Sequence, residues 1–183
     1  MPTDTEIPSD LLLLQSFVNT HELEEERDDI ASAAGLAAWL ADAGLGPRTL
    51  RATAADVRAA GDVREAIRVL LRSHNSEDVD TAPAAAVLER AARRARLELT
   101  FSGDCAAVIE PRATGAPAAL GRIVAAVARA SATDEWRRLK SCRAESCRWA
   151  FYDQARNQSR AWCSMKVCGN REKARIYRER HLK

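Results

Sequence analysis

Four of the five cysteines lie within 27 residues, and their spacing suits a metal ion. Cys142 and Cys147 form one pair, Cys163 and Cys168 form a second, and fifteen residues separate the pairs. Two pairs of thiolates joined by a loop that can fold back meet the tetrahedral coordination of a structural Zn²⁺ ion. Four thiolates fill that coordination sphere, so no position is left for a catalytic water. We therefore predict one structural zinc ion bound by these four cysteines.

The alternative for the four cysteines is two disulfide bonds in an exported protein. An export signal is not visible, because the early apolar cluster Leu11–Leu14 follows acidic residues and is too short to span a membrane. Disulfides would also leave the fifth cysteine, Cys105, without a partner. The sequence favours zinc, a cytoplasmic location and no membrane association.

The charges are divided unevenly along the chain. Residues 1–135 hold 14 arginines and 22 acidic residues, a net charge of −8, whereas residues 136–183 hold 14 basic and four acidic residues, a net charge of +10. This division predicts two domains, the second of which binds a polyanion. A solvated basic tail is the alternative that composition leaves open.

A basic helix is predicted after the last cysteine, beginning near Gly169. Arg171, Arg175 and Arg178 follow at i, i+4 and i+7, so they share one stripe of this helix. Such a stripe can contact phosphates, or guanine edges if the helix enters a major groove; the alternative is a solvated charged face. We predict that these arginines bind DNA, supported from the sides by Lys173, Arg160 and Arg156.

Two further groups of residues are expected to complete this region. A small aromatic core beside the metal is predicted to contain Trp136, Trp149, Phe151, Tyr152 and Trp162. Tyr177 of the basic helix can pack against it, and Asn170 can cap that helix with its side-chain oxygen. The positive surface is expected to extend over basic residues ahead of the helix, namely Arg137, Arg138, Lys140, Arg143, Arg148, Arg156, Arg160 and Lys166.

The part before the cysteines is predicted to be mainly helical. After a disordered start at 1–10, a short helix or buried segment at 11–19 precedes an acidic run at 22–29, which is expected to be a solvated loop or helix face. Apolar residues then recur at helical spacing in the segments 30–43, 53–72, 83–96 and 118–130. Strict alternation over 97–101, a turn and a return strand at 106–110 predict a β-hairpin.

The expected fold class is therefore α+β with two domains. A mainly helical domain with a small β-hairpin spans 11–132, and a small zinc-finger domain, made of a β-hairpin and a C-terminal helix, spans 136–183.

Residues 138–180 resemble the CGNR zinc-finger family, named for the motif that is here Cys168, Gly169, Asn170 and Arg171. Ala155 departs from the serine more usual at its position. The other residues that match the family pattern are Phe151, Tyr152, Asp153, Arg156, Asn157, Ser159, Arg160, Trp162, Cys163, Ser164 and Met165. The resemblance implies a zinc finger, whose DNA binding is inferred in the family largely from its basic residues.

The N-terminal part resembles the ABATE domain of stress-induced transcription regulators in bacteria. The residues that match are Phe17–Thr20 and the helix Leu36–Leu40, which contains Trp39. The two resemblances together imply a bacterial, cytoplasmic, zinc-dependent DNA-binding regulator. Within it, Asn19 and Thr20 are candidates for a small-molecule ligand pocket, although their plainer role is to satisfy buried backbone groups.

We therefore predict a transcription regulator whose finger binds DNA and whose N-terminal domain senses a ligand or mediates association. The alternative is a zinc-stabilised protein-interaction module, whose basic face docks on an acidic partner such as its own N-terminal domain. An enzyme is not expected, because the sequence shows no nucleophile with a base, no phosphate loop and no open metal site. The oligomeric state is left open, with a dimer as one option.

Overall fold

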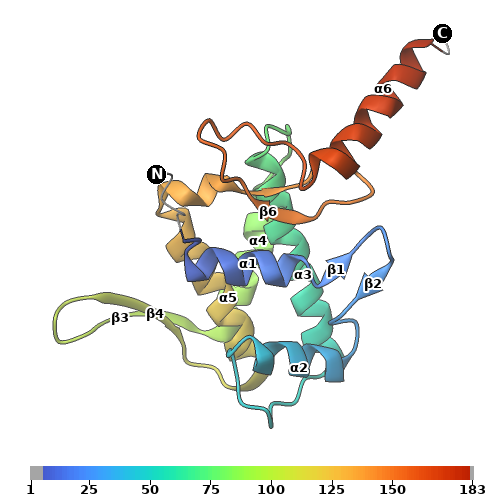
Figure 1. The fold of residues 1–183 in the computed structure, drawn as a ribbon. Helices are drawn as coiled ribbons and strands as arrows, with labels where there is room; N and C mark the ends of the chain where they lie inside the picture. Colours follow the sequence, from blue (N-terminus) through green and yellow to red (C-terminus); the bar gives the residue numbers. More distant parts are fainter. Residues whose placement is uncertain (1–5, 182–183) are drawn as a thin grey trace.

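Every segment with helical spacing forms a helix in the computed structural model, which describes residues 6–181 (Figure 1). The predicted α+β fold class is confirmed, with small antiparallel strand pairs beside the helices. The helices that precede the cysteines are α1 (Ser9–Val18), α2 (Ala33–Asp42), α3 (Ala54–Ser73), α4 (Ala82–Ala95) and α5 (Gly115–Ser131).

Side-chain caps set where two of these helices begin. Ser32 accepts a hydrogen bond from the Gly35 backbone N–H at 3.0 Å, so α2 begins at Ala33 rather than at the predicted residue 30. Thr53 and Asp56 form a reciprocal capping box at the start of α3, in which each side chain accepts from the other's backbone N–H.

The main core lies where α1 crosses α3 and α5, while α4 packs against the same two helices (Figure 1). The Phe17 and Trp39 rings are 5.2 Å apart between centroids and join α1 to α2. Burial of each large aliphatic side chain stabilises the fold by about 1.5–3 kcal/mol. The largest fully buried side chains of this core include Leu11, Leu14, Phe17, Ile30, Leu36, Leu40, Ile67, Leu71 and Ile123.

The predicted β-hairpin consists of β3 (Leu97–Phe101) and β4 (Ala107–Pro111), paired antiparallel. Its root lies close to α5, where a Cβ added to Gly121 would come within 3.3 Å of the Leu97 and Pro111 side chains. Its tip projects away from the helices (Figure 1), and the side chains of Leu99 and Phe101 are 60% and 66% exposed.

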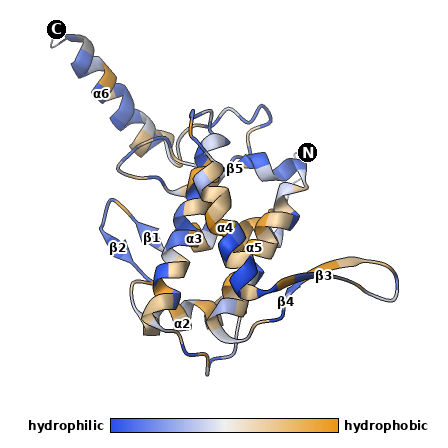
Figure 2. Ribbon diagram, turned by 180° about the vertical axis from the view of Figure 1, so that it is seen from behind, coloured by the Kyte–Doolittle hydropathy of each residue, from blue (hydrophilic) through white to orange (hydrophobic). Residues whose placement is uncertain are grey.

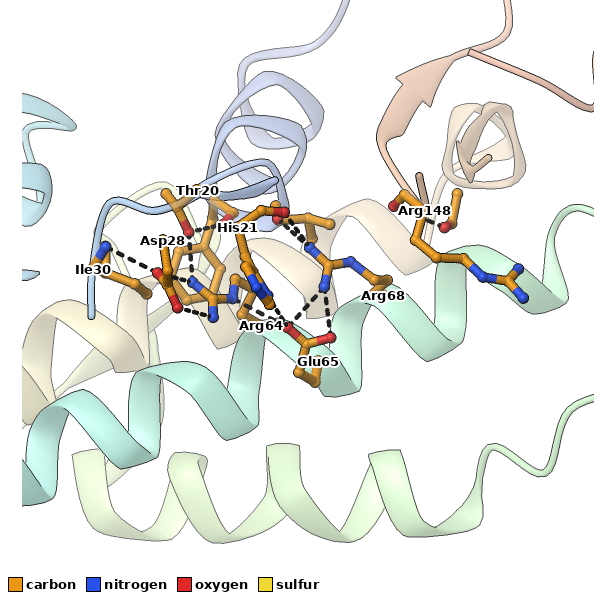
Figure 3. Close-up of polar contacts among 11 residues, drawn as sticks. Thr20, His21, Asp28, Ile30, Arg64, Glu65, Arg68 and Arg148 are labelled. Atoms are coloured by element: carbon orange, nitrogen blue, oxygen red, sulfur yellow. Dashed lines mark hydrogen bonds and ion pairs between the residues drawn. The ribbon is translucent and has the colours of Figure 1, made fainter. Parts of the chain in front are cut away.

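The acidic run forms a small hairpin: residues 23–26 are a largely exposed turn, in line with the expected solvated loop, but the strands on either side of the turn were not expected. Strands β1 (His21–Glu22) and β2 (Arg27–Asp28) pair antiparallel. Arg27 pairs with Glu22 at 2.8 Å across the strands, and Asp28 forms an ion pair with the buried Arg64 of α3 at 2.7 Å (Figure 3). Opposite charges that face each other across the two strands favour their pairing, although the acidic sequence of this segment suggests a solvated loop.

The C-terminal part begins with a short 3-10 helix at Asp134–Arg138 and holds the predicted hairpin and helix. Strand β5 (Leu139–Ser141) pairs antiparallel with β6 (Ala150–Tyr152). A π-helical turn at Met165–Gly169 leads into α6 (Asn170–His181). Helix α6 extends away from the rest of the molecule, and its residues are mostly hydrophilic (Figures 1 and 2).

Within residues 6–181, no helix combines the length and the apolar character that a membrane crossing requires.

Candidate metal centre and basic surface

The four cysteines converge on one point of the C-terminal part. Their Sγ atoms all lie within 4.8 Å of one another. The Sγ atom of Cys163 lies 3.6 Å from that of Cys147 and 3.7 Å from that of Cys168. Zinc–sulfur bonds of about 2.3 Å in a tetrahedron separate the sulfurs by about 3.8 Å, whereas a disulfide needs about 2.05 Å. The four thiols are free, and their spacing fits one metal ion rather than two disulfides.

Short turns bring the cysteines together. Cys142 directly follows β5, and Cys147 closes a turn in which its backbone N–H donates to the Ala144 carbonyl at 2.9 Å. In the π-helical turn that holds Cys168, the Gly169 backbone N–H donates to the Ser164 carbonyl at 3.0 Å. A Cβ added to Gly169 would lie 2.5 Å from the sulfur of Met165, a flexible and exposed side chain that could move aside.

The four thiols change one another's pKa values because their sulfur atoms lie so close together. Hydrogen bonds from Cys147 and Cys163 lower the pKa of Cys142 to about 2, while Cys142 and Cys147 raise the pKa of Cys163 above its ordinary value. Thiolates this close together repel one another. A bound cation would offset this repulsion and stabilise four thiolates together, so the donor set fits a metal ion.

The aromatic residues do not form the single core expected beside the metal. Phe151 and Trp162 pack with the cysteines, whereas Trp136 and Tyr152 belong to the main core. The reason is the alternation of side chains along β6, which points Phe151 to one face and Tyr152 to the other. Tyr177 is 62% exposed and stacks on His181 at 4.0 Å, so it is not part of either core.

Two of the basic residues expected on the positive surface are instead paired with acidic residues. Lys140 is buried and forms an ion pair with the fully buried Asp153 at 2.8 Å. Arg148 forms an ion pair with Glu77 at 2.5 Å. The buried ammonium group of Lys140 requires an anionic partner, and the half-buried guanidinium group of Arg148 is held by Glu77, so the sequence expectation fails for both positions.

The arginine stripe predicted on the basic helix does lie along one cleft. Arg171, Arg175 and Arg178 line a cavity of about 450 Å³ together with Arg143, and Cys168 contributes to its wall. The same cleft also contains acidic side chains and a serine, namely Glu145, Glu172 and Ser146.

The stripe is held by ion pairs and backbone contacts. Arg175 pairs with Glu172 at 2.6 Å and with Glu179 at 2.5 Å, and Arg171 reaches Glu24 of the β1–β2 hairpin at 2.6 Å. These contacts raise the pKa of both guanidinium groups, first through the hydrogen bonds that Arg175 donates to Glu172 and Arg171 donates to Glu24. Arg178 donates to the backbone of its own helix.

The three supporting residues lie elsewhere. The Arg160 guanidinium lies 5.0 Å from the centre of the Phe151 ring and donates to two backbone carbonyls around the cysteines. Lys173 and Arg156 are exposed, and neither forms an ion pair within the described part of the chain. The prediction that these residues bind DNA is not decided by this geometry.

Asn170 does not cap the basic helix with its oxygen as expected. Its side-chain amide donates to the Lys166 carbonyl at 3.1 Å, one turn earlier, because the π-helical turn continues directly into α6 and its backbone lacks the extended conformation of a cap.

Asn19 and Thr20, the candidate ligand residues, both bond within the chain. The Asn19 amide accepts from the Ala150 N–H at 2.7 Å and donates to the Ala150 carbonyl at 2.9 Å. Thr20 donates to the Phe17 carbonyl and accepts from Arg64 at 3.0 Å (Figure 3). A ligand at either side chain would have to displace these partners, and the pocket stays a prediction.

Comparison with protein-family models assigns both parts of the chain. The ABATE model, described as "Putative stress-induced transcription regulator", matches residues 13–134, which is more than half of the chain. The chain belongs to the ABATE family. A second model, the CGNR zinc finger, matches residues 138–181, which include the four cysteines and α6. No curated protein matches the chain.

The family assignments confirm the two resemblances and their order along the chain. We refer below to residues 13–134 as the ABATE domain and to residues 138–181 as the CGNR finger. The finger lies on the ABATE domain, because Asn75, beyond the end of α3, and Asn19, beyond the end of α1, both bond to its backbone.

The sequence reasoning missed two residues on which the finger depends. Asn75 reads as an ordinary polar residue beyond a helix, and nothing in its neighbours indicates contacts 66 and 86 positions away. Asp153, which the sequence analysis named only as part of the family pattern, had a visible signal, since it is one of only four acidic residues in 136–183 and directly follows a hydrophobic strand segment.

Proposed function

We propose that this chain is a zinc-dependent DNA-binding transcription regulator without enzymatic activity, acting in the bacterial cytoplasm. Zinc would be held by Cys142, Cys147, Cys163 and Cys168, and DNA by the arginine stripe of α6. The ABATE domain would sense a ligand or mediate association. The family description supports the regulatory role, and the four-cysteine cluster supports the metal.

The observation that most supports DNA binding is the placement of α6. The helix begins at the residue after the metal-site turn and projects freely from the body (Figure 1). A B-DNA major groove, about 12 Å wide, admits a helix of this kind. Arg171, Arg175 and Arg178 face one cleft of this projecting part, where they could reach phosphates or guanine edges.

The first test is selection of genomic DNA. Zinc-loaded full-length protein would be incubated with sheared genomic DNA at moderate salt, and the bound fragments sequenced. Enrichment of a few sites that disappears on chelation supports a sequence-specific regulator. Uniform recovery would reduce the proposal to electrostatic binding, and no recovery would contradict it.

A second test addresses the predicted contact at Arg175. Replacing Arg175 with Ala should weaken DNA binding and reduce the slope of log affinity against log salt by about 1, if the arginine contacts a phosphate. Arg58→Ala is the matched control, because Arg58 is also basic and exposed but lies on α3, away from the finger, and forms no ion pair within the described part of the chain. Equal effects of the two changes would remove Arg175 from the interface.

The projecting β3–β4 hairpin favours association as the role of the ABATE domain. A two-stranded hairpin with Leu99 and Phe101 exposed lacks the packing that usually stabilises such a pair in water. Sedimentation of the native protein and of Phe101→Ser would distinguish the two roles. If the native protein sediments as an oligomer and Phe101→Ser as a monomer, the ABATE domain mediates association. If both proteins sediment as monomers, ligand sensing is left as the role of the ABATE domain.

The protein-interaction module remains the second candidate, because the finger already meets an acidic surface of its own chain. Arg171 of the CGNR motif contacts Glu24 of the ABATE domain. If this face serves proteins rather than DNA, the zinc-loaded chain should recover no DNA fragments while retaining its metal.

A further inference from the structure

A short segment of the ABATE domain, residues 74–77, follows the end of α3 and contacts the CGNR finger beside its metal ligands. The Nδ1 atom of His74 lies 2.8 Å from the Leu139 carbonyl at the start of β5, and the His74 ring packs edge-on against Trp136 at 4.8 Å. Glu77, at the other end of the segment, pairs with Arg148, which directly follows the ligand Cys147. The segment therefore contacts the finger on both sides of its first cysteine pair.

Asn75 lies at the centre of this segment and is 97% buried, with 3% of its surface exposed. Its side-chain amide donates one hydrogen bond to the Ser141 carbonyl at 2.7 Å and another to the Ala161 carbonyl at 2.8 Å. Ser141 directly precedes Cys142, and Ala161 lies two residues before Cys163. The single NH₂ group thus joins the two chain segments that carry the first and third metal ligands.

The backbone of Asn75 makes a third link to the same place. Its carbonyl accepts two hydrogen bonds from the Arg143 guanidinium, at 2.8 and 2.6 Å. Arg143 directly follows Cys142, and its own backbone N–H donates to the Ala161 carbonyl at 3.1 Å. Both neighbours of Cys142 in the sequence are therefore bonded to Asn75.

We propose that Asn75 is a positioning residue of the metal site, through which the ABATE domain holds the two halves of the CGNR finger at the separation that one metal ion requires. The proposal rests on the metal site of the proposed function. Asn75 touches no cysteine sulfur; it acts through the residues beside them. Groups that orient metal ligands in this way typically change metal affinity by about 10–100-fold when they are replaced.

The chemistry of the amide predicts an order among variants. Asn75→Ala removes both donors and leaves the Ser141 and Ala161 carbonyls without this partner. Asn75→Asp keeps the shape but places carboxylate oxygens, which accept and do not donate, against the same two carbonyls. If Asn75 acts as a donor, Asp should weaken the site more than Ala does. If the side chain merely fills space, Asp should be the milder change.

The test is zinc release from the full-length protein. Zinc-loaded wild type and variants would be mixed with a chromogenic chelator, and the rate of zinc transfer followed by absorbance. We expect release at least about tenfold faster for Asn75→Ala and faster still for Asn75→Asp. The visible spectrum of the Co²⁺-loaded proteins is a second readout, since it reports distortion of tetrahedral thiolate coordination directly.

Asp56→Ala is the matched control, because Asp56 is similarly buried in the ABATE domain but caps the opposite end of α3, roughly 25 Å away along the helix. This variant should lose stability and keep wild-type zinc release. Release that rises in all three variants in proportion to the loss of Tm would overturn the positioning role. Release at the wild-type rate in Asn75→Asp would do the same.

Two outcomes separate this inference from the proposed function. If the wild type binds no zinc, the metal site fails and this inference fails with it. If the wild type binds zinc and the Asn75 variants hold it equally well, only the positioning role fails. Should Asn75→Asp not fold, Asn75→Ser retains one donor, and its release rate should lie between those of the wild type and Asn75→Ala.

Discussion

The buried pair of Lys140 and Asp153 leads to a prediction that can be worked out from its surroundings. The Lys140 side chain is 5% exposed and that of Asp153 is fully buried. Besides the ammonium group, the Asp153 carboxylate accepts from the Ala155 and Arg160 backbone N–H groups, at 3.0 and 2.9 Å. Removing this carboxylate leaves an ammonium ion without its anion and two N–H groups without an acceptor.

Asp153→Ala should therefore lower the free energy of unfolding by about 3–5 kcal/mol, the usual cost of breaking a buried pair from one side. For a chain of this size, that corresponds to a fall in Tm of roughly 6–20 °C. Urea unfolding of the zinc-saturated protein, followed by tryptophan fluorescence, measures the change. The double variant Lys140→Met with Asp153→Ala should be more stable than Asp153→Ala alone, because it no longer buries an unpaired charge.

Two results would refute this reasoning. A loss below about 1 kcal/mol for Asp153→Ala would mean that the pair behaves like an exposed one. A double variant less stable than the single variant would mean that the hydrogen bonds from Lys140 to the Gln158 and Arg160 carbonyls outweigh the cost of its unpaired charge.

The same pair makes stability depend on pH. Burial raises the pKa of Asp153, but the hydrogen bonds from Lys140 and the backbone outweigh this effect, so the pKa lies below 3.8. The stability it contributes is therefore present above pH 3.8 and is lost as the pH falls through the folded pKa.

Three further predictions concern the core, the interdomain contact and the basic surface. Leu36→Ala should lower the free energy of unfolding by about 2–5 kcal/mol, because Leu36 is fully buried; urea unfolding with a smaller loss would mean that the core closes around the cavity. Burial lowers the pKa of His74 below 6.5, although its hydrogen bond with the Leu139 carbonyl acts in the opposite direction. The neutral His74 ring therefore contributes its full share to the stability of the fold above pH 6.5, and this contribution falls as the pH drops below 6.5. An NMR titration midpoint at or above 6.5 would contradict that assignment. Glu24→Gln removes the anion that pairs with Arg171 and should strengthen DNA binding, measured by fluorescence anisotropy at low salt; unchanged affinity would show that the contact does not compete with DNA.

The helices and the metal site could be predicted because their signals are local. Apolar residues at helical spacing locate α3 within one residue at each end, and a capping box marks its start. The spacing within and between the cysteine pairs likewise predicts metal binding from neighbouring residues alone. The β1–β2 hairpin was missed because two-residue strands leave no periodicity, and because charge pairs such as Arg27 with Glu22 are visible only after folding.

Contacts between residues that lie far apart in the sequence could not be predicted. Lys140 reads as a surface cation until Asp153 is placed beside it, thirteen residues later. Trp136 and Tyr152 read as part of a finger core until the ABATE domain is placed against them. Asn75 is the extreme case, since its role depends on two carbonyl groups of another segment.

The sharing of Trp136 and Tyr152 with the main core also bears on how such chains are recombined, in evolution or in the laboratory. A finger grafted onto a foreign partner would arrive with an apolar underside that its own ABATE domain normally covers. Such a chimera would expose aromatic surface and tend to aggregate unless the new partner offered a matching hollow. The unit that can be moved intact is therefore the ABATE domain together with its finger.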